Sequence, residues 1–273
     1  MDMHNRVEFG VLAAFAALAI CANAAPPQKS LFVGITDNCT TTNHNCVEEY
    51  YATALERCGH VPVIIPKTKS EAALRRILDR LDAVIISGGR PSVRRESCAA
   101  PRLDDPSDPV GWRDRFDSAV LRYAADRRMP VLGVCRGAQV MNVFFGGTMQ
   151  SAYDTYYGKN GKPSVNHNRY SYFGAATNPP THTISIVPGT RLARLVGTNG
   201  LAVACHHGKA VACIAPGFRV AAVAADGLVE AIESEDLPMI GVQFHPETVV
   251  AEHPAEGFEL ERLEALFRRL ADY

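Results

Sequence analysis

The feature that most restricts the fold of this chain is an apolar segment that turns sharply into a second apolar segment. Residues 131–134 are expected to form a buried parallel strand, because they are a short apolar run that follows a proline and ends in a turn. Residues 136–145 are apolar on most sides and stop at a glycine pair, as a buried helix with a glycine C-cap does. The two segments therefore predict a strand joined directly to a helix.

Cys135 stands at the corner between them, with Gly133 and Gly137 on either side. Small residues at these positions let the strand and the helix approach closely, as in the elbow that presents a catalytic nucleophile. A thiol at a helix N-terminus also meets the positive end of the helix dipole and backbone N–H groups, which favour the thiolate. We interpret Cys135 as an activated nucleophile; the alternative is that it is a buried apolar cysteine.

Strands and helices alternate along the first half of the chain. Strands are expected at residues 31–35, 61–65 and 83–86, and helices at 47–58, at 71–81 with Ser70 as N-cap, and at 112–128. This order predicts a parallel sheet with right-handed crossovers. The 273 residues are 47% hydrophobic, enough for one large α/β domain, and the net charge of -1 gives no electrostatic basis for binding nucleic acid.

The second half of the chain predicts shorter strands. An antiparallel meander is expected from strands at 182–187, 201–204, 219–224 and 229–233, with a short helix at 191–195, a final core strand at 239–244 and a polar helix at 258–273. Residues 151–180 contain few aliphatic side chains and are expected to run irregularly over the face that carries Cys135. The whole pattern predicts an α/β fold.

The N-terminal residues differ from the rest. Residues 9–20 are an apolar, alanine-rich run, and Ala22 and Ala24 fit a signal-peptidase site. We expect a signal peptide at residues 1–24, a single domain at 25–273, export to the periplasm or the medium, and no stable membrane span after processing. An uncleaved or lipidated anchor, the latter at Cys21, and a cytoplasmic protein are the alternatives.

The cysteine content agrees with export. Of eight cysteines, Cys21 lies in the leader, and six remain for pairing if Cys135 stays a thiol. The local pairs Cys39–Cys46 and Cys205–Cys213 each close a short loop and are the expected disulfides; the alternative is that the six are reduced core thiols of a cytosolic enzyme. None has the spacing of a zinc site.

Two further motifs end strands. Gly88 and Gly89 follow the third strand, where backbone N–H groups of a parallel sheet point toward bound ligands. His245 ends the last core strand, Pro246 fixes the backbone, and Glu247 can orient the imidazole. A thiol at an elbow, a histidine at a strand end and a carboxylate beside it make a nucleophile, base and orienting group.

These motifs resemble a known family. The segments 133–139, 142–148, 87–89, 182–192 and 241–247 are similar to those of the class I glutamine amidotransferase-like superfamily, and most similar to its γ-glutamyl-γ-aminobutyrate hydrolase group of γ-glutamyl hydrolase-type cysteine peptidases. The resemblance covers residues 31–273. It implies a flavodoxin-like, doubly wound, mostly parallel sheet with helices on both faces and a small antiparallel meander.

The resemblance implies the same triad, with Cys135 as nucleophile, His245 as general base and acid, and Glu247 as orienting carboxylate. The backbone N–H groups of Arg136 and of Gly88 or Gly89 are expected to form the oxyanion hole. Attack on a γ-glutamyl amide gives a thioester and an amine, and water then frees glutamate or a glutamyl product. No metal or cofactor is expected.

Contacts to the small-molecule γ-glutamyl substrate are expected from Arg90, Gln139, His206 and His207. Arg90 opens a basic loop that suits the substrate carboxylate, although such arginines are also typical of a solvated face. The family usually shows His-His-Gln where this chain has His206-His207-Gly208, so one side chain of the substrate pocket is in doubt. A metal at these histidines lacks a convincing third ligand in the sequence.

Three functions remain open. The first is an exported hydrolase of γ-glutamyl amines or peptides. The second is a glutaminase component that supplies ammonia to a synthase, against which the leader argues. The third is a non-catalytic binding member of the fold, against which an intact Cys135, His245 and Glu247 argue. The leaving group, endo or exo cleavage and the oligomeric state, including a homodimer, stay open.

Overall fold

The computed structural model describes residues 29–38, 48–89, 93, 111–152, 165–167, 181–252 and 257–273. The chain divides into Met1–Ser30 and Leu31–Tyr273, and the second unit is described below. The expected leader, the Cys39–Cys46 pair, Arg90 and most of the segment 151–180 lie outside the described residues. Among the described helices, none has the length and hydropathy needed to span a bilayer.

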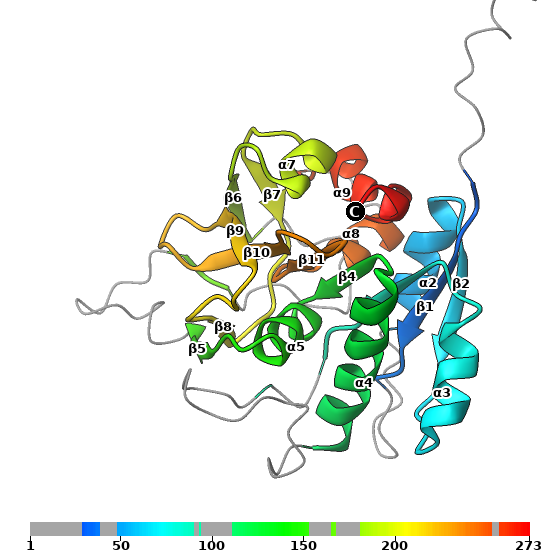
Figure 1. The fold of residues 1–273 in the computed structure, drawn as a ribbon. Coiled ribbons are helices and arrows are strands. Elements are labelled where there is room, and N and C mark those ends of the chain that lie inside the picture. Colours follow the sequence, from blue (N-terminus) through cyan, green and yellow to red (C-terminus); the bar gives the residue numbers. More distant parts are fainter. Residues whose placement is uncertain are drawn as a thin grey trace, which may run out of the picture. The chain divides into compact units, whose positions relative to one another are not determined.

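Five parallel strands form one side of the described sheet, with β2 at its edge. They lie in the order β2-β1-β3-β4-β11, and each pair of neighbours is parallel. Their bounds are Phe32–Thr36 (β1), Val61–Ile65 (β2), Ala83–Ile86 (β3), Val131–Val134 (β4) and Met239–Val242 (β11). Figure 1 shows β4 beside β11, although more than a hundred residues separate them in the sequence. The predicted parallel sheet is therefore confirmed.

Antiparallel strands continue the sheet beyond β11. The order is β11-β10-β9-β6-β7, and β8 pairs with β10 and with β5. Their bounds are Met149–Ser151 (β5), His182–Ile186 (β6), Leu201–Val203 (β7), Lys209–Val211 (β8), Phe218–Val223 (β9) and Val229–Ser234 (β10). The sequence predicted this meander but not β5 and β8, because three residues are too few to show a period of two.

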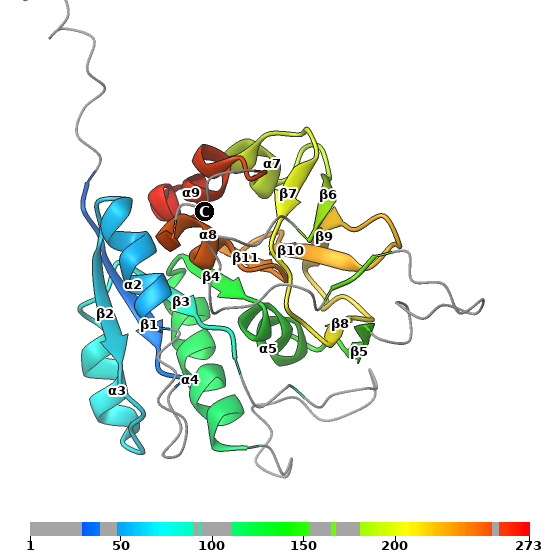
Figure 2. The same cartoon turned by 180° about the vertical axis from the view of Figure 1, so that it is seen from behind.

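Helices cover both faces of the sheet (Figures 1 and 2). One face packs against α2 (Glu48–Arg57), α7 (Arg191–Val196), α8 (Pro246–Glu252) and α9 (Leu260–Arg268). The other face packs against α3 (Glu71–Leu78), α4 (Trp112–Arg127) and α5 (Arg136–Phe144). This arrangement is the doubly wound α/β fold that the resemblance implied.

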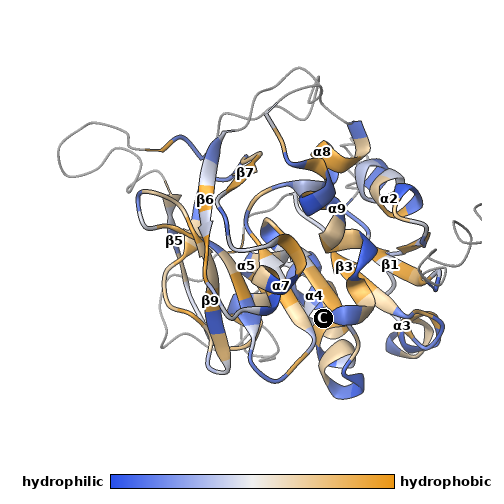
Figure 3. Cartoon of the chain, turned by 90° about the horizontal axis from the view of Figure 1, so that it is seen from above, coloured by the Kyte–Doolittle hydropathy of each residue, from blue (hydrophilic) through white to orange (hydrophobic). Residues whose placement is uncertain are grey.

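Burial of both faces explains why the central strands are apolar throughout. Along β3, Ala83 and Ile85 belong to one core cluster, whereas Val84 and Ile86 belong to the other. Successive side chains of a strand point to opposite faces, so a strand covered on both sides has no solvent-facing position. Figure 3 shows apolar colouring along β1 and β3, and hydrophilic stretches on the nearby helices α2 and α3.

Several helix ends differ from the sequence prediction. Ser70 is the N-cap of α3, as predicted, and its hydroxyl oxygen accepts from the backbone N–H of Ala73. The sequence did not predict α8, because His-Pro-Glu looked like the end of a strand rather than the start of a helix. The C-terminal helix is shorter than predicted and is followed by a short 3-10 turn, Leu270–Asp272. The C-terminal helix α9 is amphipathic rather than polar, since Leu263, Leu266 and Phe267 are buried.

The predicted Cys205–Cys213 disulfide is wrong, because neither cysteine is disulfide-bonded. Cys205 is fully buried, with its Sγ 3.7 Å from Glu230 Oε2. Cys213 is exposed, and its backbone N–H donates to Thr148. Strand β8 lies between the two cysteines and pairs on both sides, which directs their side chains to different surroundings.

Candidate active site

Cys135 lies where β4 ends and α5 begins, as the sequence predicted. Its backbone has φ 50 and ψ -103, a positive-φ conformation that non-glycine residues rarely adopt. The strain is held by the surrounding sheet, since the Cys135 N–H donates to the Val242 carbonyl at 2.7 Å. Backbone strain of this kind is typical of a nucleophile elbow.

The glycines on either side of Cys135 make the corner possible. A Cβ added to Gly133 would lie 2.9 Å from the backbone nitrogen of Ala138, and a Cβ added to Gly137 would overlap the carbonyl oxygen of Ile86. These neighbours are backbone atoms of packed elements, so they cannot move aside at low cost.

We expect Gly137→Ala to destabilise the fold by about 1–3 kcal/mol, because the methyl group would push α5 away from β3. Urea unfolding of the parent and the variant measures this loss. Gly111→Ala is the matched control, since a Cβ added there meets no atom within 4 Å and its φ is -61. Equal midpoints for the parent and Gly137→Ala would contradict the close approach of helix and strand.

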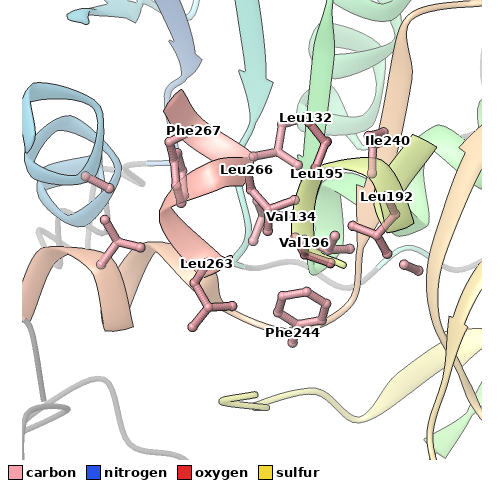
Figure 4. Packing of buried hydrophobic residues seen from close by; sticks show 14 of the residues in the cluster. Leu132, Val134, Leu192, Leu195, Val196, Ile240, Phe244, Leu263, Leu266 and Phe267 are labelled. Carbon is pink, nitrogen blue, oxygen red and sulfur yellow. The ribbon is translucent and has the colours of Figure 1, made fainter. Parts of the chain in front are cut away.

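His245 and Glu247 meet Cys135 at the carboxyl ends of β4 and β11. His245 Nδ1 lies 2.7 Å from Glu247 Oε1, and the other side of the imidazole hydrogen-bonds Cys135. All three side chains are buried. Figure 4 shows Val134 and Phe244, the residues just before Cys135 and His245, packed in one core cluster. The core therefore fixes the position of both side chains.

The electrostatics of the site favour a charged His245. Burial alone disfavours the imidazolium, but the charges of Glu247 and of the Cys135 thiolate, together with hydrogen bonds to both, hold the pKa of His245 well above its usual value. The Glu247 carboxylate thus orients the ring and stabilises its positive charge. The arrangement therefore favours an imidazolium beside the Cys135 sulfur.

Gly88 lies beside Cys135 and His245. A Cβ added to Gly88 would lie 3.3 Å from His245 Cε1 and 3.5 Å from Cys135 Cβ. The Gly88 N–H donates to the hydroxyl of Tyr51 at 2.9 Å, a partner that the sequence did not predict. Burial and the charge of Glu247 raise the pKa of the Tyr51 hydroxyl, so it stays neutral. Gly89 has φ 109, which favours glycine.

A buried group of charges, which we call the arginine–aspartate network, supports the elbow. It consists of Arg113, Asp114 and Asp117 on α4 and Arg136 on α5. The Arg136 guanidinium contacts both carboxylates, and Arg113 Nε lies 3.5 Å from Asp117 Oδ2.

The same network reaches the glycine segment. Arg113 Nη2 donates to the carbonyl oxygens of Ser87, at 3.0 Å, and Gly88, at 2.9 Å. The same network therefore holds Arg136, which follows Cys135 in the chain, and the Ser87–Gly88 segment, which lies beside Cys135 in the fold. The i, i+4 spacing of Arg113 and Asp117 is a helix ion-pair signal that the sequence carried, but it did not reveal the partner on α5.

Three of the predicted substrate contacts lie in the described residues, and they differ in burial and in partners. Gln139 is buried, and its amide donates to the Lys209 carbonyl and to Gln243 Oε1, both at 3.2 Å, so it links α5 to neighbouring segments. His207 is buried and its Nε2 lies 3.4 Å from Glu230 Oε1. His206 is exposed.

The comparisons with known proteins agree with this combination of fold and site. The chain belongs to the peptidase C26 family, whose model matches residues 31–247 and so includes Cys135, His245 and Glu247. Membership supports a hydrolase that is γ-glutamyl hydrolase-like or amidotransferase-like. The resemblance inferred from the sequence motifs is therefore confirmed.

Curated relatives include a Mycobacterium tuberculosis protein provisionally named a glutamine amidotransferase, which is 36% identical over 72% of this chain and 61% of its own length. Protein NtpR of Enterococcus hirae is 32% identical over 72% of this chain and 79% of its own length. The γ-glutamyl-γ-aminobutyrate hydrolase PuuD of Escherichia coli is 28% identical over 74% of this chain and 78% of its own length. The chain thus spans less than two thirds of the mycobacterial relative.

Among solved structures, a glutamine amidotransferase from Thermotoga maritima superposes with a TM-score of 0.53 at 11% identity, covering 89% of this chain and 97% of that chain. This likeness concerns the fold alone. It confirms the α/β architecture that was predicted from the alternation of strands and helices.

Proposed function

We propose that this protein is a hydrolase of γ-glutamyl amide bonds that uses Cys135 as its nucleophile. The observation that carries the proposal is the contact of Cys135, at a strained strand-to-helix corner, with a His245 that Glu247 holds at 2.7 Å. A nucleophile, a base and an orienting carboxylate in this geometry are typical of acyl transfer. Similarity to PuuD supports the γ-glutamyl substrate class.

In the proposed first half-reaction, the Cys135 thiolate attacks the γ-carbonyl carbon, and the carbonyl electrons move to oxygen. The C–N bond then breaks as His245 gives its Nε2 proton to the leaving nitrogen. The products are a glutamyl thioester on Cys135 and a free amine. In the second half-reaction, neutral His245 removes a proton from water, hydroxide attacks the thioester, and the thiolate leaves.

The oxyanion of both tetrahedral intermediates needs hydrogen-bond donors. We assign this role to the backbone N–H groups of Arg136 and of Gly88 or Gly89. Because the Gly88 N–H is paired with Tyr51, its use requires the substrate oxygen to replace the tyrosine hydroxyl. The arginine–aspartate network would keep these segments in place while the charge develops.

A panel of substrates tests the proposal. The parent protein is incubated with γ-glutamyl amines, γ-glutamyl peptides, the matching α-glutamyl amides and glutamine, and free glutamate and the released amine are measured. Release from γ-linked but not α-linked substrates is the expected result. A folded protein that releases glutamate from none of them, with an unreactive Cys135, would contradict the hydrolase and favour a binding protein.

The glutaminase component is the second candidate, favoured by the Mycobacterium tuberculosis relative that is provisionally named a glutamine amidotransferase. Such a component hydrolyses glutamine and passes ammonia to a synthase. Turnover of glutamine alone, with no release from γ-glutamyl amines, would favour this candidate. Copurification with a synthase would add to it.

We expect kcat/KM to fall as the pH rises through the raised pKa of His245, because the leaving amine then lacks its proton donor. Glu247→Gln removes a charge that raises this pKa, so the alkaline limb of the pH profile should move to lower pH. The profile of kcat/KM against pH for both proteins measures the shift. Glu252→Gln is the control, since Glu252 lies on the same helix as Glu247 but hydrogen-bonds Tyr50 instead of His245. An unmoved alkaline limb in Glu247→Gln would contradict the assignment.

We also propose that residues 1–24 direct export, on the strength of the apolar run and the Ala22-x-Ala24 site. N-terminal sequencing of the protein recovered from fractionated cells tests this. A mature chain that begins at Ala25 outside the cytoplasm is the expected result. An intact Met1 in the cytoplasmic fraction would contradict it.

A further inference from the structure

A second buried group of side chains lies next to the proposed active site and has no role in the proposed hydrolysis. It consists of His167, Cys205, His207 and Glu230, which we call the His–Cys–Glu cluster. One ligand atom from each residue lies within 4.8 Å of those of the others, and all four residues are buried. Cys205 and His207 lie between β7 and β8, and Glu230 lies on β10, in the antiparallel part of the sheet (Figure 2).

Hydrogen bonds outside the cluster determine where the histidine lone pairs lie. His207 Nδ1 is 3.0 Å from the carbonyl oxygen of Lys209, which can only accept, so Nδ1 carries the proton and Nε2 of the neutral ring carries a lone pair. His167 Nε2 is 2.9 Å from Asp226 Oδ2, so in the neutral ring, the form that binds a metal ion, the lone pair lies on Nδ1. Burial opposes a charged His167, but the hydrogen bonds and charges of Glu230 and Asp226 raise its pKa, so either a proton or a metal ion can occupy the space beside Nδ1. Both lone pairs face Glu230.

Acceptor atoms therefore converge inside the cluster. His167 Nδ1 lies 3.0 Å and His207 Nε2 3.4 Å from the same oxygen, Glu230 Oε1. All three atoms are buried and lack a well-aligned hydrogen-bond donor. Lone pairs at these distances repel one another unless a proton or a metal ion lies among them.

The outer contacts are those of metal-binding histidines. A histidine ligand usually donates its second ring N–H to a carboxylate or a backbone carbonyl, which fixes the ring and its tautomer. Asp226 does this for His167, and the Lys209 carbonyl does it for His207. The backbone N–H of His207 also donates to the carbonyl of His167 at 2.9 Å, which holds the two rings together.

We propose that the His–Cys–Glu cluster binds a zinc-class divalent metal ion through Cys205 Sγ, His167 Nδ1, His207 Nε2 and a Glu230 carboxylate oxygen. Thiolate, imidazole and carboxylate together favour Zn²⁺ over Mg²⁺ or Ca²⁺. A tetrahedron with metal–ligand distances of about 2.0–2.3 Å has ligands about 3.3–3.8 Å apart. The separation of Cys205 Sγ and Glu230 Oε2, 3.7 Å, fits this geometry.

Four protein ligands in a buried site are typical of a structural metal. The ion would join the β7–β8 connection to β10 and to the segment around His167. Ala204, which precedes Cys205, accepts a hydrogen bond from the backbone N–H of His245 at 2.8 Å. The metal would therefore stabilise the segment around Ala204, which hydrogen-bonds the backbone of His245, without taking part in the chemistry at Cys135.

Cobalt substitution tests the site. The full chain carrying Cys135→Ala is treated with a chelator, desalted and titrated with Co²⁺, and Zn²⁺ is then added. We expect one equivalent of Co²⁺ to give the visible bands of a tetrahedral ion and a near-ultraviolet thiolate charge-transfer band, both removed by Zn²⁺. The melting temperature should rise when Zn²⁺ is added. Because Cys135 is absent, the result does not depend on the proposed hydrolysis.

Variants identify the ligands. Adding Cys205→Ser should remove the charge-transfer band and weaken binding at least about 10-fold, and Glu230→Gln should weaken binding while leaving the thiolate band. Cys213→Ser is the matched control, because Cys213 is also outside any disulfide but is exposed. A folded chain that takes up no metal would overturn the proposal. The positive charge inside the cluster would then come from protonation of both ring nitrogens of His167. A Co²⁺ spectrum that survives Cys205→Ser unchanged would also overturn it.

Discussion

Cys135→Ala is expected to lower the release of glutamate from γ-glutamyl amides on the order of 10³-fold or more, with the fold intact. The thiolate forms the covalent bond in the proposed reaction, and no other cysteine in the described residues contacts His245 in this way. The Cβ remains in alanine, so the corner keeps its backbone conformation. Steady-state kinetics and circular dichroism of the parent and the variant measure both parts of the prediction.

The members of the triad should also act as a unit. His245→Ala alone should cost about as much activity as His245→Ala combined with Cys135→Ala, because a nucleophile without its base is nearly inactive. Cys58→Ala is the matched control, since Cys58 is a buried free cysteine at the end of α2 whose Sγ contacts the Glu264 carbonyl. Loss of activity in Cys58→Ala, or retention in Cys135→Ala, would contradict Cys135 as the nucleophile.

Asp117→Asn is expected to destabilise the protein by about 3–5 kcal/mol, because it leaves the buried guanidinium groups of Arg113 and Arg136 with too little negative charge. The side chains of Asp117 and Arg136 are 0% and 1% exposed, so solvent cannot replace the lost partner. A loss of this size should lower the melting temperature by roughly 10 °C. Calorimetry of the parent and the variant measures it.

An exposed ion pair provides the control for Asp117→Asn. Glu71 and Arg75 on α3 lie 3.4 Å apart, with side chains 76% and 55% exposed, so Glu71→Gln should change the melting temperature very little. Asp117→Asn should also lower kcat/KM, since Arg113 holds the Gly88 carbonyl beside Cys135. A variant as stable as the parent would show that the arginine–aspartate network does not support the elbow.

Local sequence patterns predicted the features that depend on neighbouring residues. The bounds of β2, β3 and β4 follow from short apolar runs between turn residues, and Ser70 begins α3 through its own side-chain hydrogen bond. The corner at Cys135 follows from two glycines within a few residues. The patterns failed at β5, β8 and α8, which are short and take their form from the sheet around them.

The site shows the same division. Sequence spacing places Glu247 beside His245, because the two residues belong to one strand end and the following helix. Tyr51, which holds the Gly88 N–H, carries no local signal of this role. Neither does Arg136, whose partners on α4 become visible only when the two helices pack together. Contacts between distant residues leave little trace in a single sequence.

The sequence by itself determined the alternation of strands and helices, the thiol at the corner after β4 and the histidine at the end of β11. Only the tertiary structure decided that these strands are neighbours, that buried arginines and aspartates hold the elbow, and that His167, Cys205, His207 and Glu230 converge. The physical reason is that propensity and period act over a few residues, whereas burial and charge pairing act between residues that meet only in the folded chain.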